Sequence, residues 1–320
     1  MTVPLVIDTD TAQDDCVALL VGLLDPAADL RAITMVAGNV GFDQQVRNAF
    51  MTLNVAGAPA VPVYLGCRRP LVREWVSAED VHGDGSGGLS MAQEGLEPEA
   101  EHAVDALVRM AAEAPGELSV VAIGPLTNIA AAVVKDPGFA RNVKSLFIMG
   151  GSNNGRGNIT AAAEFNFYVD PEAAKAVFAA GFDITVVPWD PLTLRQAVFG
   201  QERLDEIAAL DTPLSRFFTR ICAATLEFDR RVGIDGTTHP DSLTAAVLLH
   251  PELVRRASPY HVDVETAGEL TRGYSAMSWG VHGLAPNARV VEEVDAEAFY
   301  ALIKGVLARE TAPEREITGL

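Results

Sequence analysis

Four carboxylates lie close together near the start of the chain, directly after an apolar run that begins at Leu5. They are Asp8, Asp10, Asp14 and Asp15. Carboxylates at this density repel one another, and capping a helix requires only one of them. A bound hard cation is the simplest explanation for the others, because carboxylate oxygens are the ligands that Ca²⁺ and Mg²⁺ prefer. The cluster therefore predicts a metal or sugar site.

The surrounding residues predict that a strand, a tight loop and a helix carry this cluster. Asp8 and Asp10 have the same parity on the extended segment, so their side chains can point the same way. Asp14 and Asp15 fall in the first turn of the following helix, where the helix dipole favours anions. A purely structural role stays open for Asp8, whose carboxylate can also hydrogen-bond the loop backbone.

Two other acidic motifs are compared with the cluster. An EF-hand loop that starts at Asp8 needs glycine at its sixth position and glutamate at its twelfth, but these positions hold Gln13 and Leu19. The pattern Asp-x-Asp-x-Thr/Val of the haloacid dehalogenase type of phosphatase ends here in Ala12. The EF-hand is therefore excluded, and the phosphatase is disfavoured without being excluded.

The composition is that of a globular protein with an acidic surface. The chain has 320 residues, of which 49% are hydrophobic and 21% charged, and its net charge is −19. This charge argues against nucleic acids and anionic membrane surfaces as partners. The three cysteines, Cys16, Cys67 and Cys222, are far apart in apolar contexts and are typical of reduced core residues.

The organisation of the chain indicates one domain. We find no linker, repeat or low-complexity segment, and we expect a single domain over residues 1–310 followed by a tail over 311–320. The sequence begins with a predicted strand instead of a signal peptide, and no apolar run is long enough to span a bilayer. We therefore expect a cytoplasmic protein.

Short β-rich runs alternate with longer helical patterns, which predicts an α/β fold with a doubly wound, mainly parallel sheet flanked by helices. The expected strands are 3–8, 31–37, 62–65, 118–123, 144–149 and 184–188. The expected helices are 14–24, 43–56, 101–114, 128–134, 171–180, 201–209, 214–229, 241–249 and 296–307. Alternating residues over 260–294 predict a small antiparallel hairpin near the C-terminus.

Polar residues that follow the predicted strands form a second group of candidates. Amides and carboxylates that meet at the carboxyl edge of one sheet can satisfy sugar hydroxyls as donors and acceptors. The residues in these positions are Asn39, Asn128, Asn153, Asn154, Asn158, Glu164, Asn166, Asp170 and Asp241. Structural roles stay open for several of them, because Asn39, Asn128, Asp170 and Asp241 also suit turns or helix caps.

Several of these pieces, taken in order, resemble the calcium-dependent nucleoside hydrolases of the inosine-uridine preferring type. The matching motifs extend over almost the whole chain, and Gly-Pro-Leu-Thr-Asn and Glu-Phe-Asn behind Asp-Thr-Asp are highly specific together. The motifs are Asp8-Thr9-Asp10-x-x-x-Asp14-Asp15, Gly38-Asn39, His82-Gly83-x-Gly85, Gly124-Pro125-Leu126-Thr127-Asn128, Met149-Gly150-Gly151, Glu164-Phe165-Asn166-x-x-x-Asp170-Pro171-Glu172-Ala173, and Asp241.

The resemblance implies a role for each matching residue. It implies that Ca²⁺ is bound by Asp10, Asp15, Asp241 and the carbonyl group of Ile123. It implies that the ribose is held by Asp14, Asn39, Asn158, Glu164 and Asn166, and we expect His82 to contact the substrate as well. It also implies a ribonucleoside as the small-molecule partner and a homodimer or homotetramer as the assembly.

The implied reaction is hydrolysis of the N-glycosidic bond, with Asp10 as the general base for a water on the cation. Asp14 and Glu164 would stabilise the cationic sugar in the transition state. The chain departs from the family pattern at Pro240, where members carry His or Trp directly before the late aspartate, and Pro cannot donate a proton. Among His239, His82, Trp189 and Trp279, we assign the leaving-group role to His239.

Two alternatives to the hydrolase remain. The first is a Ca²⁺-dependent ribose or nucleoside binder with weak or no activity, which Pro240 would explain. The second is the phosphatase, although Ala12 and the lack of a basic phosphate cradle argue against it. The preferred nucleobase cannot be predicted, because residues that contact the base lie on loops and on the helix 214–229, whose side-chain directions are not readable.

Overall fold

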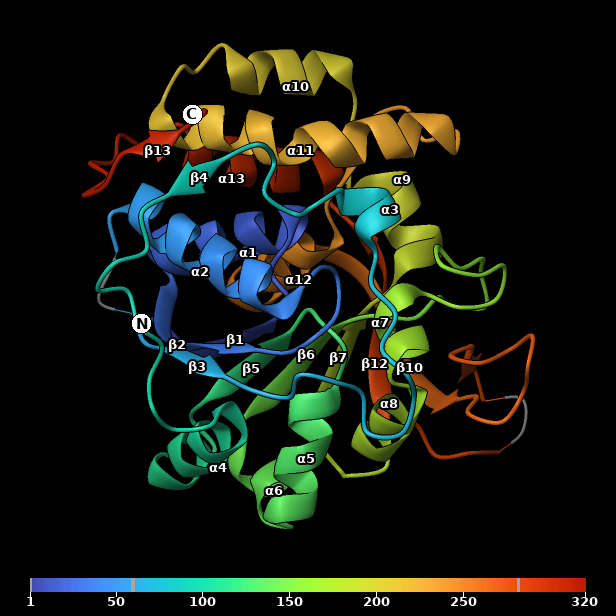
Figure 1. Cartoon of the computed structure of the whole chain (residues 1–320). Coiled ribbons are helices and arrows are strands. Elements are labelled where there is room, and N and C mark those ends of the chain that lie inside the picture. The colour runs from blue at the N-terminus through green and yellow to red at the C-terminus, as the bar shows by residue number, and fades with distance from the viewer. Residues whose placement is uncertain (1, 59–60, 281–282) are drawn as a thin grey trace.

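The computed structural model describes residues 2–58, 61–280 and 283–320. In this part of the chain, a nine-stranded sheet with the strand order β11-β10-β12-β7-β6-β5-β1-β2-β3 forms the middle layer. Helices cover both faces of the sheet, with α1, α2 and α12 on one side and α4, α5 and α6 on the other (Figure 1). The predicted doubly wound α/β fold is confirmed.

The helices and strands have the following bounds. The strands are β1 Val3–Thr9, β2 Ala28–Met35, β3 Val63–Leu65, β4 Ser90–Met91, β5 Ser119–Ala122, β6 Ser145–Met149, β7 Ile184–Val187, β8 Val198–Phe199, β9 Thr237–Thr238, β10 Val254–Val264, β11 Ser275–Ser278, β12 Ala288–Val294 and β13 Ile317–Thr318. The α-helices are α1 Gln13–Leu24, α2 Phe42–Ala56, α3 Glu79–His82, α4 Ala103–Glu113, α5 Thr127–Lys135, α6 Phe139–Asn142, α7 Phe165–Val169, α8 Pro171–Phe178, α9 Leu194–Gln196, α10 Gln201–Ala208, α11 Pro213–Arg231, α12 Pro240–Leu249 and α13 Ala296–Leu307. A π-helical turn spans Trp189–Thr193, and a 3₁₀ turn spans Pro251–Leu253.

The predicted antiparallel hairpin over 260–294 belongs to the main sheet. Strand β10 pairs antiparallel with both β11 and β12. Strand β12 in turn pairs parallel with β7, through Arg289 opposite Thr185 and Val290 opposite Val186. The antiparallel unit is therefore real, but it extends the edge of the parallel sheet and is not a separate hairpin. The predicted hairpin includes residues 281–282, which lie outside the described residues.

Strand β1 divides the apolar residues between two cores, one on each face of the sheet. Leu5 and Ile7 belong to the cluster that contains α1, α2, α12 and α13, whereas Val6 belongs to the cluster under α4, α5 and α8. This alternation follows from the strand geometry, which directs successive side chains to opposite faces. Both faces of β1 are covered and it lies between β5 and β2 inside the sheet, which explains its apolar run from Val3 to Ile7.

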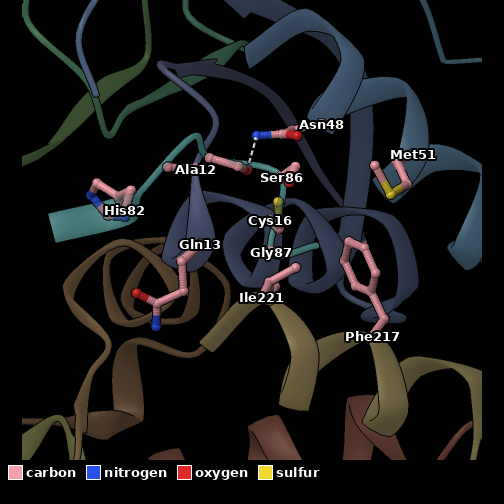
Figure 2. Close-up of a pocket in the computed structure, with 11 residues that line it drawn as sticks. Ala12, Gln13, Cys16, Asn48, Met51, His82, Ser86, Gly87, Phe217 and Ile221 are labelled. Atoms are coloured by element: carbon pink, nitrogen blue, oxygen red, sulfur yellow. Dashed lines mark hydrogen bonds between the residues drawn. The ribbon is translucent and has the colours of Figure 1, made fainter. Parts of the chain in front are cut away.

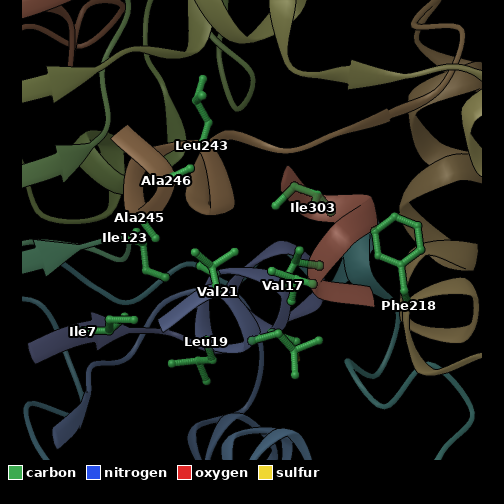
Figure 3. Packing of buried hydrophobic residues seen from close by; sticks show 14 of the residues in the cluster. Ile7, Val17, Leu19, Val21, Ile123, Phe218, Leu243, Ala245, Ala246 and Ile303 are labelled. Carbon is green, nitrogen blue, oxygen red and sulfur yellow. The ribbon is translucent and has the colours of Figure 1, made fainter. Parts of the chain in front are cut away.

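Helix α1 is buried on every side, which explains why its sequence is apolar around its whole circumference. Figure 3 shows Val17 and Val21 of α1 directed toward the helices that carry Ile303 and Ala245, and Leu19 on the opposite side of the helix. Asp15 stabilises the start of the helix, because its Oδ2 accepts a hydrogen bond of 3.0 Å from the backbone N–H of Ala12. The first turn of α1 is thereby fixed at the end of β1, where the acidic cluster lies.

Residues 311–320, which the sequence analysis treats as a tail, pack on the domain. Strand β13 pairs antiparallel with β4, with Ile317 opposite Met91. The backbone N–H of Arg315 donates a 2.9 Å hydrogen bond to Asn54 Oδ1, and Asn54 Nδ2 donates one of 3.0 Å to the Arg315 carbonyl oxygen. Ile317 is the apolar residue that anchors this segment, because its side chain is buried. These contacts connect residues 311–320 to the rest of the described chain, and the domain boundary at residue 310 stays a prediction.

We also searched the described helices for segments that could cross a membrane. None of them is both long enough and apolar enough to do so.

Candidate active site

A pocket opens at the carboxyl ends of the central strands, where the acidic cluster lies. Its volume is about 300 Å³. Its floor contains Asp14, Asp15 and Asp241, and amide side chains such as Asn39 line it as well. In a parallel sheet the carboxyl ends of neighbouring strands meet at one edge, so β1, β5 and β6 bring these residues together from distant parts of the chain.

Asp10 has no exposed surface and does not itself line the pocket, but it lies beside Asp15 and Asn39, which do. Its Oδ2 accepts a hydrogen bond of 2.9 Å from the backbone N–H of Asn39, whereas its Oδ1 is buried without a partner in the described structure. Burial raises the pKa of Asp10 well above its ordinary value, and the charge of Asp15 raises it further. Gly38 leaves space for this carboxyl group, because a Cβ atom there would lie 1.9 Å from Asp10 Oδ2.

Asp15 is held by three hydrogen bonds and is connected to Asp10 through Asn39. Thr9 Oγ1 donates to Asp15 Oδ1 over 2.6 Å, and the Ala12 N–H and Asn39 Nδ2 donate to Oδ2 over 3.0 and 3.1 Å. Burial also raises the pKa of Asp15. Asn39 therefore orients both carboxyl groups, one through its backbone and the other through its side chain.

Asp241 comes from the first turn of α12 and faces the same cluster. Burial raises its pKa well above the ordinary value, and the charges of Asp15, Asp14, Asp10 and Glu164 add to this effect. Carboxyl groups that raise each other's pKa are stabilised when a cation lies among them. The unpartnered Asp10 Oδ1 is a further oxygen that is available to such an ion.

The donor set therefore fits a hard cation, although it is not a preformed cage. Among the described residues, no group of three or more His, Cys, Asp or Glu side chains is gathered closely enough to hold a metal ion as it stands. The carbonyl oxygen of Ile123 accepts a hydrogen bond of 3.0 Å from Asn166 Nδ2. A carbonyl oxygen has a second lone pair, so this bond leaves it able to bind an ion.

Glu164 and Asn166 are placed by the short helix α7. Glu164 caps this helix, because its Oε1 accepts from the Asn166 N–H over 2.8 Å and its Oε2 accepts from the Phe167 N–H over 3.3 Å. Oε2 also accepts a 2.8 Å bond from the Gly151 N–H in the loop after β6. Burial raises the pKa of Glu164 to about 7, against the opposing effect of these backbone donors. Both residues line the pocket.

Asp14 lines the pocket and is held from behind by residues at the start of α12. Its Oδ2 accepts from the Asp241 N–H over 2.6 Å, and its Oδ1 accepts from Ser242 Oγ over 2.9 Å. His239 Nδ1 lies 3.0 Å from the same Oδ1 atom. Asp14 is thereby fixed by the backbone of Asp241 and by the side chains of Ser242 and His239, two residues that do not line the pocket.

His239 does not fit the role of proton donor to the leaving group that we assigned to it. The residue has no exposed surface and is absent from the pocket lining. Its Nε2 lies 2.8 Å from Thr237 Oγ1 while its Nδ1 contacts Asp14, so both ring nitrogens are engaged. The ring packs between Phe199 and Phe218, with centroid distances of 4.3 and 5.4 Å. Pro240 separates it from Asp241 and allows the side chain to turn into the core.

His82 and Asn158 both line the pocket, His82 from the last position of a short helix and Asn158 from a loop. His82 ends α3, and its Nδ1 is buried without a partner in the described structure. Burial lowers the pKa of His82 to about 4, so its ring is neutral near pH 7. Asn158 is exposed, and its Oδ1 accepts a 2.8 Å hydrogen bond from the Phe165 N–H. The structure thus brings both residues to the pocket, with Asn158 nearer the solvent.

A second, much smaller cavity of about 10 Å³ lies beside His82 and Gln13 (Figure 2). Asn48 joins the two loops around it, because its Nδ2 donates to the carbonyl oxygens of Thr11 and Gly85 over 3.0 and 2.9 Å. The loop after Asp10 is therefore tied to the glycine-rich loop after His82. Both loops line this small cavity.

Several pocket residues were not singled out by the sequence analysis. Most of them are apolar or aromatic, and the list is Leu194, Thr225, Phe228, Asp229, Val232 and Ile234. Trp189, one of the leaving-group candidates of the sequence analysis, also lines the pocket. The periodicity of α11 predicts that helix, but it does not reveal which face turns toward the pocket.

Comparison with known proteins identifies relatives along almost the whole chain. The model of the family described as "Inosine-uridine preferring nucleoside hydrolase" matches residues 5–301. An uncharacterised protein of Schizosaccharomyces pombe is 35% identical over 313 residues, which cover 95% of this chain and 99% of that protein. The pyrimidine-specific ribonucleoside hydrolase RihA of Citrobacter koseri is 34% identical over 312 residues, with 96% and 99% covered.

Solved structures agree with these relatives. A plant nucleoside hydrolase, PpNRh1, superposes with a TM-score of 0.88 at 31% identity and covers 96% of this chain and 99% of its own. A purine-preferring ribonucleoside hydrolase from Gardnerella vaginalis also reaches 0.88, at 28% identity and with 95% and 98% covered. These findings confirm the predicted family, fold and enzyme class, a hydrolase of N-glycosidic bonds in ribonucleosides. The chain belongs to the family of inosine-uridine preferring nucleoside hydrolases.

Proposed function

We propose that this protein hydrolyses ribonucleosides to ribose and a free base, with Asp10 as the general base. The observation that carries this proposal is the Asp10 carboxyl group itself. It is fully buried beside Asp15 and Asn39, which line the pocket, and its Oδ1 has no hydrogen-bond partner among the described residues. Its raised pKa suits a group that takes a proton from water.

In the proposed reaction, Asp10 takes a proton from the water that attacks the anomeric carbon of the ribose. The bond to the base lengthens as the water approaches, and positive charge develops on the sugar ring. Asp14 and Glu164 lie in the pocket wall as fixed carboxyl groups, so they can stabilise this charge without rearranging. Asn39, His82, Asn158 and Asn166 complete the set that we propose for the sugar and its hydroxyl groups.

The family to which the chain belongs is metal-dependent, and Ca²⁺ is our proposal for the ion. Its ligands would be Asp10, Asp15, Asp241 and the Ile123 carbonyl oxygen, with the remaining places open to water and ribose hydroxyls. When bound, the ion would supply positive charge that makes a neighbouring water easier to deprotonate. The mutual rise in pKa among Asp10, Asp15 and Asp241 supports a cation at this position.

The base would lie against the apolar side of the pocket. The apolar and aromatic residues in the lining include Trp189, Phe228, Val232 and Ile234. The flat ring of a nucleobase can stack on surfaces of this kind. RihA of Citrobacter koseri is named as pyrimidine-specific, whereas the Gardnerella vaginalis enzyme is named as purine-preferring. Since both resemble this chain over most of its length, we propose ribonucleosides as the substrate class without choosing between the bases.

A binder with little or no activity is the second candidate, and the burial of His239 favours it. The residue nearest in sequence to the family's leaving-group histidine has no exposed surface. If no other group activates the base, the pocket would hold a nucleoside without cleaving it. Release of free ribose separates the two candidates directly.

The test is an assay of reducing sugar with inosine, adenosine, guanosine, uridine and cytidine as separate substrates. We expect ribose from at least one of them, loss of turnover after prolonged chelation, and recovery on addition of Ca²⁺. Asp10→Asn should abolish turnover and leave the fold intact by circular dichroism. No ribose from any substrate, together with nucleoside binding by calorimetry, would favour the binder and contradict the hydrolase.

Two further expectations from the sequence stay predictions. They are assembly as a homodimer or homotetramer and a cytoplasmic location. Size-exclusion chromatography with light scattering measures the first directly, and a mass equal to that of one chain would contradict it.

A further inference from the structure

The end of helix α11 forms one wall of the pocket, and it carries an ionisable side chain among apolar ones. Thr225, Phe228, Asp229 and Val232 line the pocket from this helix. Their spacing of three and four residues places them on one face of the helix. Asp229 is the ionisable member of this set, and its carbonyl oxygen accepts a 2.8 Å hydrogen bond from the N–H of Ile234, which also lines the pocket.

One oxygen of Asp229 is anchored and the other is available. Its Oδ2 accepts hydrogen bonds from the Thr238 N–H over 3.1 Å and from Thr238 Oγ1 over 3.3 Å. Its Oδ1 has no hydrogen bond with the described residues, yet it does not belong to the polar atoms that are completely buried without a partner. Because Asp229 lines the pocket, this oxygen is reachable from the pocket side.

The anchor places Asp229 at a fixed position relative to the acidic floor. Thr238 lies in β9, which leads through His239 and Pro240 to Asp241 at the start of α12. Asp229, on α11, is therefore bound to the strand that leads to Asp241, while residues of its helix face line the pocket. A base on the wall that α11 forms, with its ribose on the floor, would lie beside the carboxyl group.

Cleavage of a bond between carbon and nitrogen is assisted when the departing base receives a proton. Other groups near the pocket are poorly suited to give it. His239 is buried with both nitrogens engaged. His82 is neutral at ordinary pH because burial lowers its pKa to about 4, and Pro240 has no proton to give.

We propose that Asp229 is the acid that protonates the leaving base. This inference rests on the proposed hydrolysis of ribonucleosides. In the step, the electron pair of the glycosidic bond passes to the base, which takes the proton of the Asp229 carboxylic acid. The attacking water forms the new bond to the anomeric carbon and gives one proton to Asp10. Exchange with solvent afterwards returns a proton to Asp229 and removes one from Asp10.

The electrostatic surroundings of Asp229 agree with this role. Burial raises the pKa of Asp229 to about 6, although the two hydrogen bonds from Thr238 and the nearby His239 act in the opposite direction. A carboxyl group in a largely apolar wall keeps its proton at higher pH than one in water. A part of the protein molecules therefore carries a protonated Asp229 near neutral pH.

The experiment compares two leaving groups in the full-length protein loaded with Ca²⁺. The best natural nucleoside requires protonation of its base, whereas p-nitrophenyl β-D-ribofuranoside releases a stable anion that requires none. We expect Asp229→Asn to lower kcat on the nucleoside by about 100-fold or more, the usual contribution of a general acid. The same preparation should hydrolyse the nitrophenyl riboside within about threefold of the unchanged protein.

The ratio of the two rates does not depend on the folded fraction, so partial unfolding of the variant does not obscure the result. Glu227→Gln is the matched control. Glu227 is exposed on the same helix and does not line the pocket, so this substitution removes the same charge outside the pocket. An equal loss on both substrates would overturn the proposal and show a structural role, as would a nucleoside rate within about threefold of the unchanged protein. If the unchanged protein hydrolyses neither substrate, the proposed function is contradicted, and this inference, which rests on it, is contradicted as well.

Discussion

His239 Nδ1 lies 3.0 Å from Asp14 Oδ1, and this contact joins the start of α12 to the first turn of α1. The two residues are far apart in the sequence, yet the histidine fixes the carboxyl group that faces the pocket. Because the histidine is buried and the aspartate lines the pocket, the histidine acts on a ligand only through Asp14.

This relationship predicts a specific effect of replacing His239. His239→Leu keeps the apolar packing against Phe199 and Phe218 but removes the hydrogen bond to Asp14. A hydrogen bond to a charged group contributes about 1.5–3 kcal/mol, so we expect KM for the nucleoside to rise by at least about tenfold. His239→Asn keeps a donor near the position of Nδ1 and should recover part of the loss. Steady-state kinetics of both variants give KM and kcat separately, and a loss confined to kcat would contradict a positioning role.

Replacing Asp10 tests the proposed base and the proposed cation together. Asp10→Asn removes a buried charge and keeps the shape, so kcat should fall by about 10²–10⁴-fold. The cation-free variant should unfold at a temperature no lower than that of the unchanged protein, because burial and Asp15 disfavour the charged form of Asp10. The rise in melting temperature that Ca²⁺ gives the unchanged protein should shrink in the variant. Differential scanning calorimetry with and without Ca²⁺ measures both effects, and an undiminished rise would remove Asp10 from the ligand set.

Glycine at position 38 is required by the place of Asp10. A Cβ atom at Gly38 would lie 1.9 Å from Asp10 Oδ2, so Gly38→Ala must displace the carboxyl group. Misplacement of a reacting group by about 1 Å can cost about 100-fold in rate, and we expect a loss of that order. Gly41→Ala is the control, because a Cβ atom there has no heavy atom within 4 Å among the neighbours considered. Similar turnover of the two variants would show that Asp10 tolerates the shift.

Asp8 gives a prediction for the pH dependence of stability. Its Oδ1 accepts hydrogen bonds from Thr34 Oγ1 and Asn128 Nδ2, while its Oδ2 is buried without a partner among the described residues. Burial raises its pKa from 3.8 to about 7. Below the lower value the side chain is neutral in the folded and the unfolded chain alike. As the pH rises toward the higher value, only the unfolded chain ionises, so the free energy of unfolding falls.

Asp8→Asn removes this contribution and keeps the acceptor for Thr34 and Asn128. A tenfold change in an acid constant corresponds to about 1.4 kcal/mol. The free energy of unfolding of the variant, relative to that of the unchanged protein, should therefore increase by roughly 2–3 kcal/mol between about pH 5 and about pH 8. Urea unfolding of both cation-free proteins at the two pH values measures this difference. A constant difference at both values would show that Asp8 ionises normally in the folded protein.

The sequence predicts the framework of the site because hydrophobic patterning determines it. The apolar run before Asp8 predicts β1, and the helical pattern after Asp15 predicts α1, so the acidic cluster was expected at a strand end. The same reasoning brought Asn39, Glu164 and Asn166 to one edge of the sheet. These residues follow strands, and parallel topology alone makes their positions converge.

The direction of a side chain is a property of tertiary packing, which the sequence does not reveal. His239 was expected in the pocket because it stands near Asp241, but the proline between them allows its ring to pack between Phe199 and Phe218. The sequence predicts Asp229 only as the last residue of the expected helix 214–229. Its role as a pocket residue depends on how α11 lies over β9, and helical periodicity carries no information about that contact.

The pairing of β13 with β4 has a practical consequence for work on this protein. Residues 315–318 hold the segment after the His82 loop, since Arg315 Nη1 donates to the carbonyl oxygens of Ala92 and Glu94 over 3.3 and 2.8 Å. A purification tag or a truncation at the C-terminal end would act on the stretch of chain that continues from one wall of the pocket. A removable tag at the other end leaves the contacts of Arg315 with Ala92 and Glu94 undisturbed and is the better choice for every assay above.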